Sequence, residues 1–174
     1  MGTYLETARL TLRHFTADDV DLLVELDSDP DVMAFLTGGA PTPRTEIEEH
    51  VLPRFMSDYP RLGVFAAVER DSGTFIGWFA MSAEAELGYR LRKEFWGRGY
   101  ATEGSRALID RTFAEHDVDR VWAVTMAVNT RSRRVMVKAG LTYVRTFFPH
   151  FDDPIPGTEK GEVEYAVTRA ERIG

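Results

Sequence analysis

The sequence predicts a mixed α/β domain, in which strands and helices follow one another along the whole chain. Two kinds of local pattern support this fold class. Short apolar segments bounded by turn residues are typical of strands, and longer segments with a polar cap at the start and glycine at the end are typical of helices. The length of 174 residues, with 44% hydrophobic residues, is sufficient for one core without disulfides or a structural metal. We therefore expect a single domain over residues 1–174.

The N-terminal region is expected to begin with a strand followed by a helix. In "RLTLRHF" (9–15), apolar and polar side chains alternate, which indicates a half-buried strand. The next segment, "TADD", places Thr16 three residues before Asp19. This spacing is that of a capping box, in which each side chain accepts a hydrogen bond from the backbone N–H of the other residue. A helix over the apolar segment 20–26 is therefore expected.

A second helix is expected to begin at Thr42 and Pro43. Thr is a frequent N-cap, and Pro suits the first turn because an N–H there has no helical acceptor. Pro53 lies further along the same segment, where a proline removes one helical hydrogen bond. We expect Pro53 to kink or divide this helix before Tyr59.

From Gly63 onwards, the pattern changes to short apolar segments that alternate with turns and two further helices. The expected elements are strands at 63–69, 74–81 and 85–91, a helix at 101–116, a strand at 120–128, a helix that ends at Gly140, and strands at 141–148 and 162–168. The first three strands are close in sequence and are expected to form a meander. Gly140 is expected to end the last helix with a left-handed cap.

Composition excludes several classes of function. The chain has no cysteine, so disulfides, thiolate metal sites and an acyl-cysteine intermediate are excluded. A formal net charge of −7 and a pI near 5.1 disfavour a nucleic-acid partner and suit a cationic amine, with solubility alone as the alternative. No apolar run has the length of a membrane span, and the N-terminus lacks the pattern of a secretion signal. We expect a cytoplasmic protein, and the widely separated histidines indicate no metal site.

The segment "EFWGRGYATEG" (94–104) places two glycines between an apolar strand and a helix. Gly97 and Gly99 allow positive φ and the close approach of a diphosphate to backbone N–H groups at the helix N-terminus. The alternative is a turn without a ligand. The loop lacks the Gly-Lys-Ser/Thr ending of a Walker nucleotide loop. Thr102 occupies the third glycine position of the dinucleotide fingerprint, and Asn129 stands where an acidic ribose ligand is required, so a dehydrogenase is a distant alternative.

Three segments, "TARLTLR", "AELGYRLRKEFWGRGYATEG" and "NTRSRRVMVKAGL", resemble the GNAT superfamily of acetyl-CoA-dependent N-acetyltransferases, in its ribosomal-protein N-terminal acetyltransferase branch. They occur in the family's order, and the resemblance extends from about Thr7 to about Arg169. It implies a mixed, mostly antiparallel sheet with helices on both faces, in which two central parallel strands, "ELGYRL" and "VWAVTMAV", splay apart. It also implies acetyl-CoA as co-substrate, no metal, and direct attack by an amine in a ternary complex.

The resemblance implies where acetyl-CoA binds. The family's phosphate loop falls on residues 96–101, with Trp96 in place of the usual Gln or Arg, so main-chain N–H groups are expected to bind the diphosphate. The pantetheine arm is expected in the gap between the splayed strands, where one N–H polarises the thioester carbonyl. Asn129 and Ser132 match the family's Asn-x-x-Ser, for which helix capping alone is the alternative. The expected cofactor-binding residues are Tyr89, Arg90, Leu91, Gly97, Arg98, Gly99, Tyr100, Ala101, Thr102, Asn129 and Ser132.

The groups that transfer protons are less clearly encoded. Many members of the family carry a tyrosine seven residues after the Asn, but here that position is Met136. The candidate proton donor is Ser132, directly or through water, and departure of the thiolate without a dedicated acid is the alternative. By analogy with the family, the candidate base is Glu86, at the strand edge ahead of the gap. Alternation is expected to place Glu84 on the same side of the strand as Glu86. Either carboxylate can then serve as the base, and solvated surface groups are the alternative.

The sequence does not identify the acceptor. The resemblance to the branch suggests a protein N-terminal amine, and a small amine such as an antibiotic, polyamine or amino acid is also compatible. The segment "FFPHFDDPIPG" (147–157) is interpreted as part of an acceptor pocket, with a rigid loop as the alternative. Met136 leaves open a second function, a non-catalytic acyl-CoA-binding or regulatory domain. The protein is expected to act as a monomer or homodimer.

Overall fold

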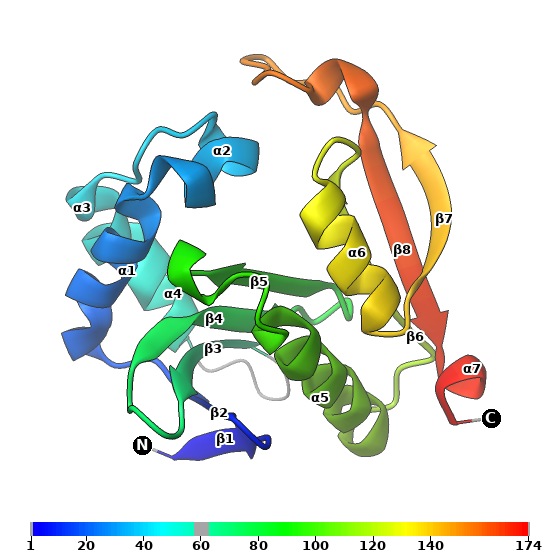
Figure 1. The fold of residues 1–174 in the computed structure, drawn as a ribbon, viewed down its shortest axis with the longest axis horizontal. Coiled ribbons are helices and arrows are strands. Elements are labelled where there is room, and N and C mark those ends of the chain that lie inside the picture. Colours follow the sequence, from blue (N-terminus) through cyan, green and yellow to red (C-terminus); the bar gives the residue numbers. More distant parts are fainter. Residues whose placement is uncertain (1, 58–62, 174) are drawn as a thin grey trace.

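The computed structural model describes residues 2–57 and 63–173, which form two antiparallel sheets with helices packed around them (Figure 1). The strands are β1 (Thr3–Glu6), β2 (Leu10–His14), β3 (Gly63–Glu69), β4 (Phe75–Met81), β5 (Leu87–Leu91), β6 (Arg120–Met126), β7 (Thr142–Phe147) and β8 (Glu162–Thr168). The α-helices are α1 (Val20–Ser28), α2 (Pro30–Thr37), α3 (Arg44–Glu46), α4 (Leu52–Met56), α5 (Tyr100–Glu115), α6 (Thr130–Lys138) and α7 (Arg169–Ile173). The short helical turns are η1 (Ala17–Asp19), the π-helical η2 (Ile47–Val51), η3 (Lys93–Phe95) and η4 (Thr158–Lys160).

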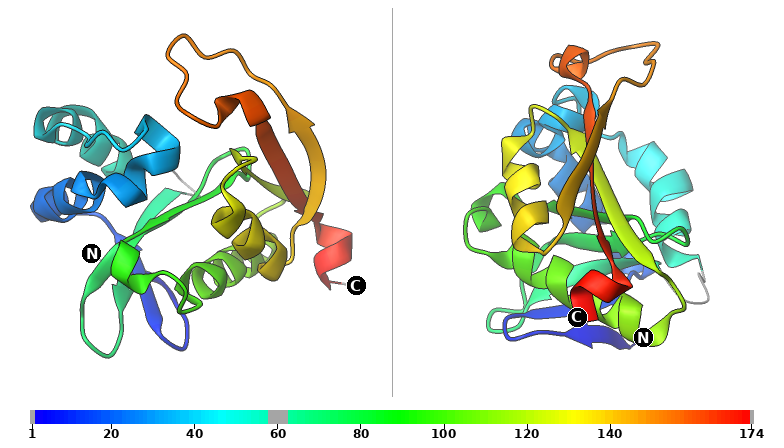
Figure 2. Two further views of the ribbon diagram at one scale, coloured as in Figure 1. Left: turned by 45° about the horizontal axis from the view of Figure 1, so that its top comes forward. Right: turned by 90° about the vertical axis from the view of Figure 1, so that its right-hand side faces the viewer.

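The two sheets meet at a pair of parallel strands that splay apart. One sheet has the order β1-β2-β3-β4-β5 and the other has the order β6-β8-β7. Strands β5 and β6 meet at a parallel bridge between Glu86 and Trp122, where the Trp122 N–H donates to the Ala85 carbonyl at 3.1 Å. The strands then diverge, and the two sheets lie at a large angle to each other in Figure 2. The predicted mixed, mostly antiparallel sheet with a splayed parallel pair is therefore confirmed.

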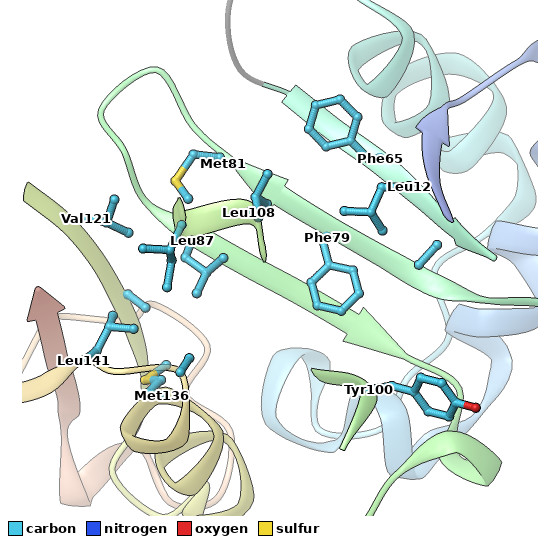
Figure 3. Close-up of a cluster of buried hydrophobic side chains, with 14 of the residues drawn as sticks. Leu12, Phe65, Phe79, Met81, Leu87, Tyr100, Leu108, Val121, Met136 and Leu141 are labelled. Atoms are coloured by element: carbon cyan, nitrogen blue, oxygen red, sulfur yellow. The ribbon is translucent and has the colours of Figure 1, made fainter. Parts of the chain in front are cut away.

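Helices cover both faces of the five-stranded sheet, as predicted. On one face, Phe65 and Ala67 of β3 and Phe79 of β4 belong to the same buried cluster as Leu108 and Ile109 of α5 (Figure 3). The opposite face packs against α1, η2 and α4 through a second cluster, which comprises Phe15, Leu23, Leu26, Ile47, Leu52, Phe55, Ala66 and Phe75. Neighbouring residues of β3 belong to different clusters because successive side chains of a strand point to opposite faces.

Gly104 allows α5 to pack directly on the sheet. A Cβ atom at this position would lie 2.3 Å from Cζ of Phe79, far inside van der Waals contact. Phe79 is fully buried in β4, so its ring occupies the space that a side chain at Gly104 would require. The close approach positions the first turns of α5 and therefore also the loop that precedes this helix.

The N-terminal part contains two elements that the local patterns do not predict, strand β1 and helix α2. Strand β1 is short and pairs with β2 at the edge of the sheet. Helix α2 begins directly after α1, where the Asp29 carboxylate accepts from the Asp31 N–H at 2.8 Å and Pro30 occupies the first turn. The predicted cap at the start of the first helix is confirmed, because the Thr16 N–H donates to the Asp19 carboxylate at 2.8 Å.

The second expected helix is distorted just before Pro53, where a kink or a division is expected, and it continues past this residue. Segments α3, η2 and α4 follow one another without a break, and the Leu52 N–H donates to the Ile47 carbonyl five residues earlier. Pro53 has no N–H, so the regular hydrogen-bond pattern cannot continue through it, and the π-helical turn lies directly before it. The expected boundary at Tyr59 lies outside the described residues. Within the described segments, no helix combines the length and the apolar character needed to cross a membrane.

Candidate active site

The glycine segment forms a tight loop between β5 and α5. Gly97, with φ of +72°, and Gly99, with φ of +84°, adopt left-handed conformations that favour glycine. The predicted turn with positive φ is therefore confirmed. Gly99 is the N-cap of α5. Trp96 anchors the start of the loop, because its indole N–H donates to the Leu91 carbonyl at 2.9 Å.

The loop and the first turn of α5 present a row of backbone N–H groups that have no acceptor. At one end, the Trp96 N–H donates to the Lys93 carbonyl at 3.0 Å, and at the other end the Glu103 N–H donates to the Gly99 carbonyl at 3.0 Å. Between them, the N–H groups of residues 97–102 have no acceptor among the residues that the structure describes. These free donors coincide with the positive end of a 16-residue helix. Free N–H groups at a helix N-terminus are an arrangement that favours anions.

Side chains of the β1–β2 hairpin hold this loop in place. Glu103 accepts from the Thr7 hydroxyl at 2.6 Å, from the Arg9 backbone N–H at 2.9 Å and from the Arg9 guanidinium at 2.6 Å. Arg9 also donates to the carbonyl of Arg98 at 2.9 Å. Burial opposes the ionisation of Glu103, but the hydrogen bonds from Thr7 and Arg9 outweigh it and lower the pKa. Glu103 therefore has a structural role, as a link between the hairpin and the loop.

Two arginines beside the loop have no carboxylate partner within the described segments. Arg98 belongs to the loop, and its guanidinium carbon lies 5.4 Å from the centre of the Phe95 ring. Arg131 comes from the first turn of α6, and its guanidinium carbon lies 4.2 Å from the centre of the Trp96 ring. The helix dipole disfavours a cation in the first turn. Arg131 nevertheless holds a positive charge over the ring of Trp96, the residue that replaces the family's Gln or Arg. Sequence analysis did not identify Arg131.

Strand β5 directs alternate main-chain groups towards the gap beside β6. The Arg92 N–H donates to the Ile76 carbonyl, and the Ser82 N–H donates to the Glu86 carbonyl. These bonds show that the even-numbered residues of β5 form the hydrogen-bonded pairs with β4. Tyr89 has an odd number, so its N–H and C=O point away from β4 and towards the gap.

The three residues predicted around this gap differ in their surroundings. The Leu91 N–H also points away from β4, but the Leu91 carbonyl accepts from the Trp96 indole. Arg90 pairs with Trp78 of β4, and its side chain donates to the Asp27 carboxylate at 2.6 Å. The structure therefore brings Tyr89 and the Leu91 N–H to the gap, and places the main-chain groups of Arg90 in the sheet.

At the start of α6, Asn129 and Ser132 form a hydrogen-bonded cluster with Tyr89. Asn129 is the N-cap, because its Oδ1 accepts from the Ser132 N–H at 3.2 Å, and its Nδ2 donates to the Thr125 hydroxyl at 3.2 Å. The hydroxyl oxygens of Tyr89 and Ser132 lie 2.8 Å apart. Burial raises the pKa of Tyr89 to about 12, although this hydrogen bond opposes the shift. Met136 is only 3% exposed and packs in the core, and its thioether has no proton to donate.

Glu86 lies where β5 and β6 meet. Burial and, to a smaller extent, the charge of Glu84 raise the pKa of Glu86, which improves a carboxylate as a base near neutral pH. Glu86 directly precedes β5, and alternation places it on the face opposite to Tyr89. The expectation that Glu84 shares the face of Glu86 by alternation is wrong. Glu84 lies in a turn ahead of the strand, and Ala85 interrupts the extended backbone with φ of +63°.

The loop between β7 and β8 folds back towards α2 and the end of β6. Ile155 packs at Gly38, the C-cap of α2, where a Cβ atom would lie 3.3 Å from Cγ2 of Ile155. Gly157 lies against Val128, which follows β6. Figure 1 shows the loop and α2 at the same end of the molecule. The participation of this loop in an acceptor pocket stays a prediction.

Comparisons with known proteins agree with this geometry. Residues 9–142 match the family described as "Acetyltransferase (GNAT) domain". A relative from Aspergillus fumigatus, named FsC-acetyl coenzyme A-N(2)-transacetylase, is 36% identical, over 96% of this chain and 77% of that protein. Spermidine N-acetyltransferase from Vibrio cholerae, solved with CoA and spermine, has a TM-score of 0.79 at 15% identity, over 97% of this chain and 100% of that chain. The RimL ribosomal alpha-N-protein acetyltransferase, solved with coenzyme A, has a TM-score of 0.79 at 17% identity, over 96% of this chain and 98% of that chain. These two structures share the fold, and the family match and the 36% identical relative show that this chain belongs to the GNAT family of acetyltransferases.

Proposed function

We propose that the protein is an acetyl-CoA-dependent N-acetyltransferase, with one catalytic domain over residues 1–174, that transfers an acetyl group to a primary amine by direct attack in a ternary complex. The observation that carries this proposal is the row of free N–H groups at residues 97–102, next to the gap between β5 and β6. The donors suit a diphosphate. The thioester then lies between the diverging strands, and membership of the GNAT family supports the same reaction.

The N–H groups of residues 97–102 bind the diphosphate of the coenzyme in this proposal. Gly97 and Gly99 have no side chains that would keep the phosphate oxygens away from these donors. Arg131, held on the Trp96 ring, adds a positive charge beside them. The main-chain N–H groups thus orient the diphosphate. The arginine adds an electrostatic attraction to it, which weakens as the salt concentration rises.

Main-chain groups of β5 bind the pantetheine arm and polarise the thioester. The N–H and C=O of Tyr89 and the N–H of Leu91 face the gap, and they pair with the amides of the arm. One N–H donates to the thioester oxygen, where negative charge develops during attack. A donor held in position before the reaction stabilises this charge without further reorganisation.

Glu86 takes the proton of the acceptor, and Ser132 stabilises the leaving thiolate. Glu86 accepts a proton from the acceptor ammonium, directly or through water, and its raised pKa suits this step. The neutral amine then attacks the acetyl carbon, and its nitrogen releases a second proton to water as the amide forms. Ser132 donates to the sulfur while the carbon–sulfur bond breaks. The two side chains lie on opposite faces of β5, which allows the amine and the coenzyme to approach from different sides.

We propose a small-molecule amine as the first acceptor to test. The Aspergillus fumigatus relative is named as an N(2)-transacetylase of FsC, and it is more similar to this chain in sequence than the spermidine and ribosomal-protein enzymes are. The net charge of −7 and the half-buried Glu86 suit an acceptor that arrives as an ammonium ion. A protein N-terminal amine is the second acceptor class.

Two measurements test the proposed function. Calorimetry with coenzyme A is expected to show binding, and mass spectrometry with acetyl-CoA is expected to show one acetyl group added to an amine. The panel should include amino-acid derivatives, polyamines, aminoglycosides and peptides with free N-termini. Binding of coenzyme A without transfer to any of them would support the alternative, a non-catalytic acyl-CoA-binding domain. No binding of coenzyme A would refute both, and binding of a nicotinamide cofactor would support a dehydrogenase.

A further inference from the structure

We infer that the Tyr89 hydroxyl is a positioning group for Ser132: it donates to the Ser132 oxygen and thereby directs the Ser132 O–H at the departing sulfur. This inference rests on the proposed function and assigns a role to the Tyr89 side chain. The expected role of Tyr89 involves only its main-chain groups, which face the gap. The same residue would then bind the coenzyme through its backbone and orient the proton donor through its side chain.

The geometry fixes Ser132 from two directions. Its backbone N–H donates to Asn129 Oδ1 at 3.2 Å, which holds the residue in the first turn of α6. Its hydroxyl lies 2.8 Å from the hydroxyl of Tyr89, which comes from β5. The ring of Tyr89 packs against Phe79, with the ring centres 6.1 Å apart. A side chain held in this way has few alternative rotamers, so its hydroxyl can act as a fixed donor.

The direction of the hydrogen bond follows from the chemistry of the two hydroxyls. A phenol is the stronger acid, and each hydroxyl has one hydrogen to donate. Burial keeps Tyr89 protonated throughout the neutral range, because its pKa is raised to about 12. Ser132 is the acceptor that the described residues offer to the Tyr89 hydroxyl. When Tyr89 donates to this oxygen, the hydrogen of Ser132 is free to point elsewhere.

The position of the pair explains how the site can work without the family's usual tyrosine. Met136 occupies that position, is buried in the core, and has no donor group. Ser132 lies one helical turn earlier in α6 and has a hydroxyl. In the proposed step, the electrons of the carbon–sulfur bond stay on sulfur, Ser132 donates a hydrogen bond to this sulfur, and water later supplies the proton of the free thiol. Ser132 therefore needs only a directed hydrogen and loses no proton.

Two readouts in four proteins test the inference: the wild type, Tyr89→Phe, Ser132→Ala and the double variant. The first readout is kcat with acetyl-CoA and the best amine. The second is the pKa of the coenzyme A thiol in the complex, followed by the ultraviolet absorbance of the thiolate. The protein has no cysteine, so the coenzyme is the source of this signal. Melting temperature and coenzyme affinity report on folding and binding.

Each single variant is expected to lower kcat roughly tenfold, the usual effect of one hydrogen bond to a charged group. Each is also expected to raise the thiol pKa, because the thiolate loses a donor. The double variant should match Ser132→Ala, since Tyr89 acts through Ser132. Ser132→Thr, which keeps the hydroxyl, should recover most of the loss. Tyr143→Phe is a matched control, because the Tyr143 hydroxyl bonds Thr146 on the exposed strand β7.

Two results would overturn the inference. The first is a Tyr89→Phe protein with wild-type kcat and wild-type thiol pKa. The second is a double variant whose loss equals the product of the two single losses, which would make the hydroxyls independent. If the wild-type protein acetylates no amine, the proposed function fails, but the thiol titration still measures whether Tyr89 acts on the coenzyme sulfur through Ser132. If Tyr89→Phe does not fold, the Ser132→Ala titration decides whether this hydroxyl faces the sulfur at all.

Discussion

The glycine loop at residues 97–102 and the gap beside β5 draw on different parts of the chain. In the loop, the donors are backbone N–H groups of consecutive residues, 97–102, and glycines shape it. In the gap, the groups proposed for catalysis are side chains from separate elements, with Glu86 ahead of β5, Tyr89 in β5 and Ser132 in α6. The difference shows that a site made of main chain can be recognised from one short segment. A site made of side chains depends on how distant elements pack.

The largest expected effect is on the loop, from Gly99→Glu. The added carboxylate stands among the N–H donors, and φ of +84° strains any side chain. We expect coenzyme A affinity to fall on the order of 100-fold, equivalent to the loss of two hydrogen bonds to a charged group. Calorimetry checks this. Gly73→Glu is the control, because Gly73 has φ of +70° and open space in the β3–β4 turn. Normal affinity in Gly99→Glu would refute a main-chain site.

The next expected effect is on the gap and changes kcat, whereas the change in the loop affects coenzyme affinity. Glu86→Gln is expected to lower kcat on the order of 100-fold, a usual contribution of a general base, with little change in coenzyme affinity. The raised pKa of Glu86 predicts that the wild-type rate falls as the pH drops through this value, because the base must be unprotonated. Steady-state rates across pH check this, and the acidic limb should be absent in the variant.

The control for this measurement is Glu84→Gln. Glu84 is exposed in the turn before β5 and is expected to change kcat little. Full turnover of Glu86→Gln at every pH would eliminate Glu86 as the base. A larger decrease of kcat in Glu84→Gln than in Glu86→Gln would identify Glu84, in the turn, as the base.

A smaller effect tests whether side-chain charge contributes to the loop. Arg131→Ala is expected to weaken coenzyme A binding roughly fivefold at low salt, which corresponds to one exposed ion pair of about 1 kcal/mol, and less at high salt. Adding Trp96→Arg should restore the affinity, because it returns a cation to the same place. Binding of dephospho-coenzyme A shows whether the 3′-phosphate or the diphosphate is the partner of Arg131. Equal affinities of Arg131→Ala and the wild type for coenzyme A at low salt would show that the charge of Arg131 does not contribute to binding.

The smallest effect concerns the support of the loop by the β1–β2 hairpin. Glu103 has a lowered folded-state pKa, so its ionised form stabilises the fold above its unfolded pKa, and this contribution is lost as the pH falls through the folded pKa. Glu103→Gln is therefore expected to lower the melting temperature by a few degrees near neutral pH, or about 1 kcal/mol. The difference in melting temperature between Glu103→Gln and the wild type should become smaller at acidic pH. Thermal unfolding across pH measures it, and a constant difference at all pH values would contradict this role.

Local patterns predicted most elements from β3 onwards. Strands and helices there end at clear signals, such as Gly140, whose φ of +100° and hydrogen bond to the Val137 carbonyl at 3.0 Å match the expected cap. The N-terminal part was harder to predict. Helix α2 follows α1 after a single residue, Asp29, and β1 is a short edge strand. Both owe their place to contacts with the rest of the fold more than to their own periodicity.

The sequence by itself determined most of the elements from β3 onwards, the two glycines of the loop and the loss of the usual tyrosine at Met136. These features depend on backbone conformation or residue identity within a few positions. The tertiary structure decided the roles of side chains. The guanidinium of Arg131 lies over the ring of Trp96, and Glu84 lies in a turn and not in the strand. The hydroxyls of Tyr89 and Ser132, 43 positions apart in sequence, form a hydrogen bond. Hydrogen bonds and charges act over a few ångströms, and only the packing of β5, α5 and α6 brings these groups within that distance.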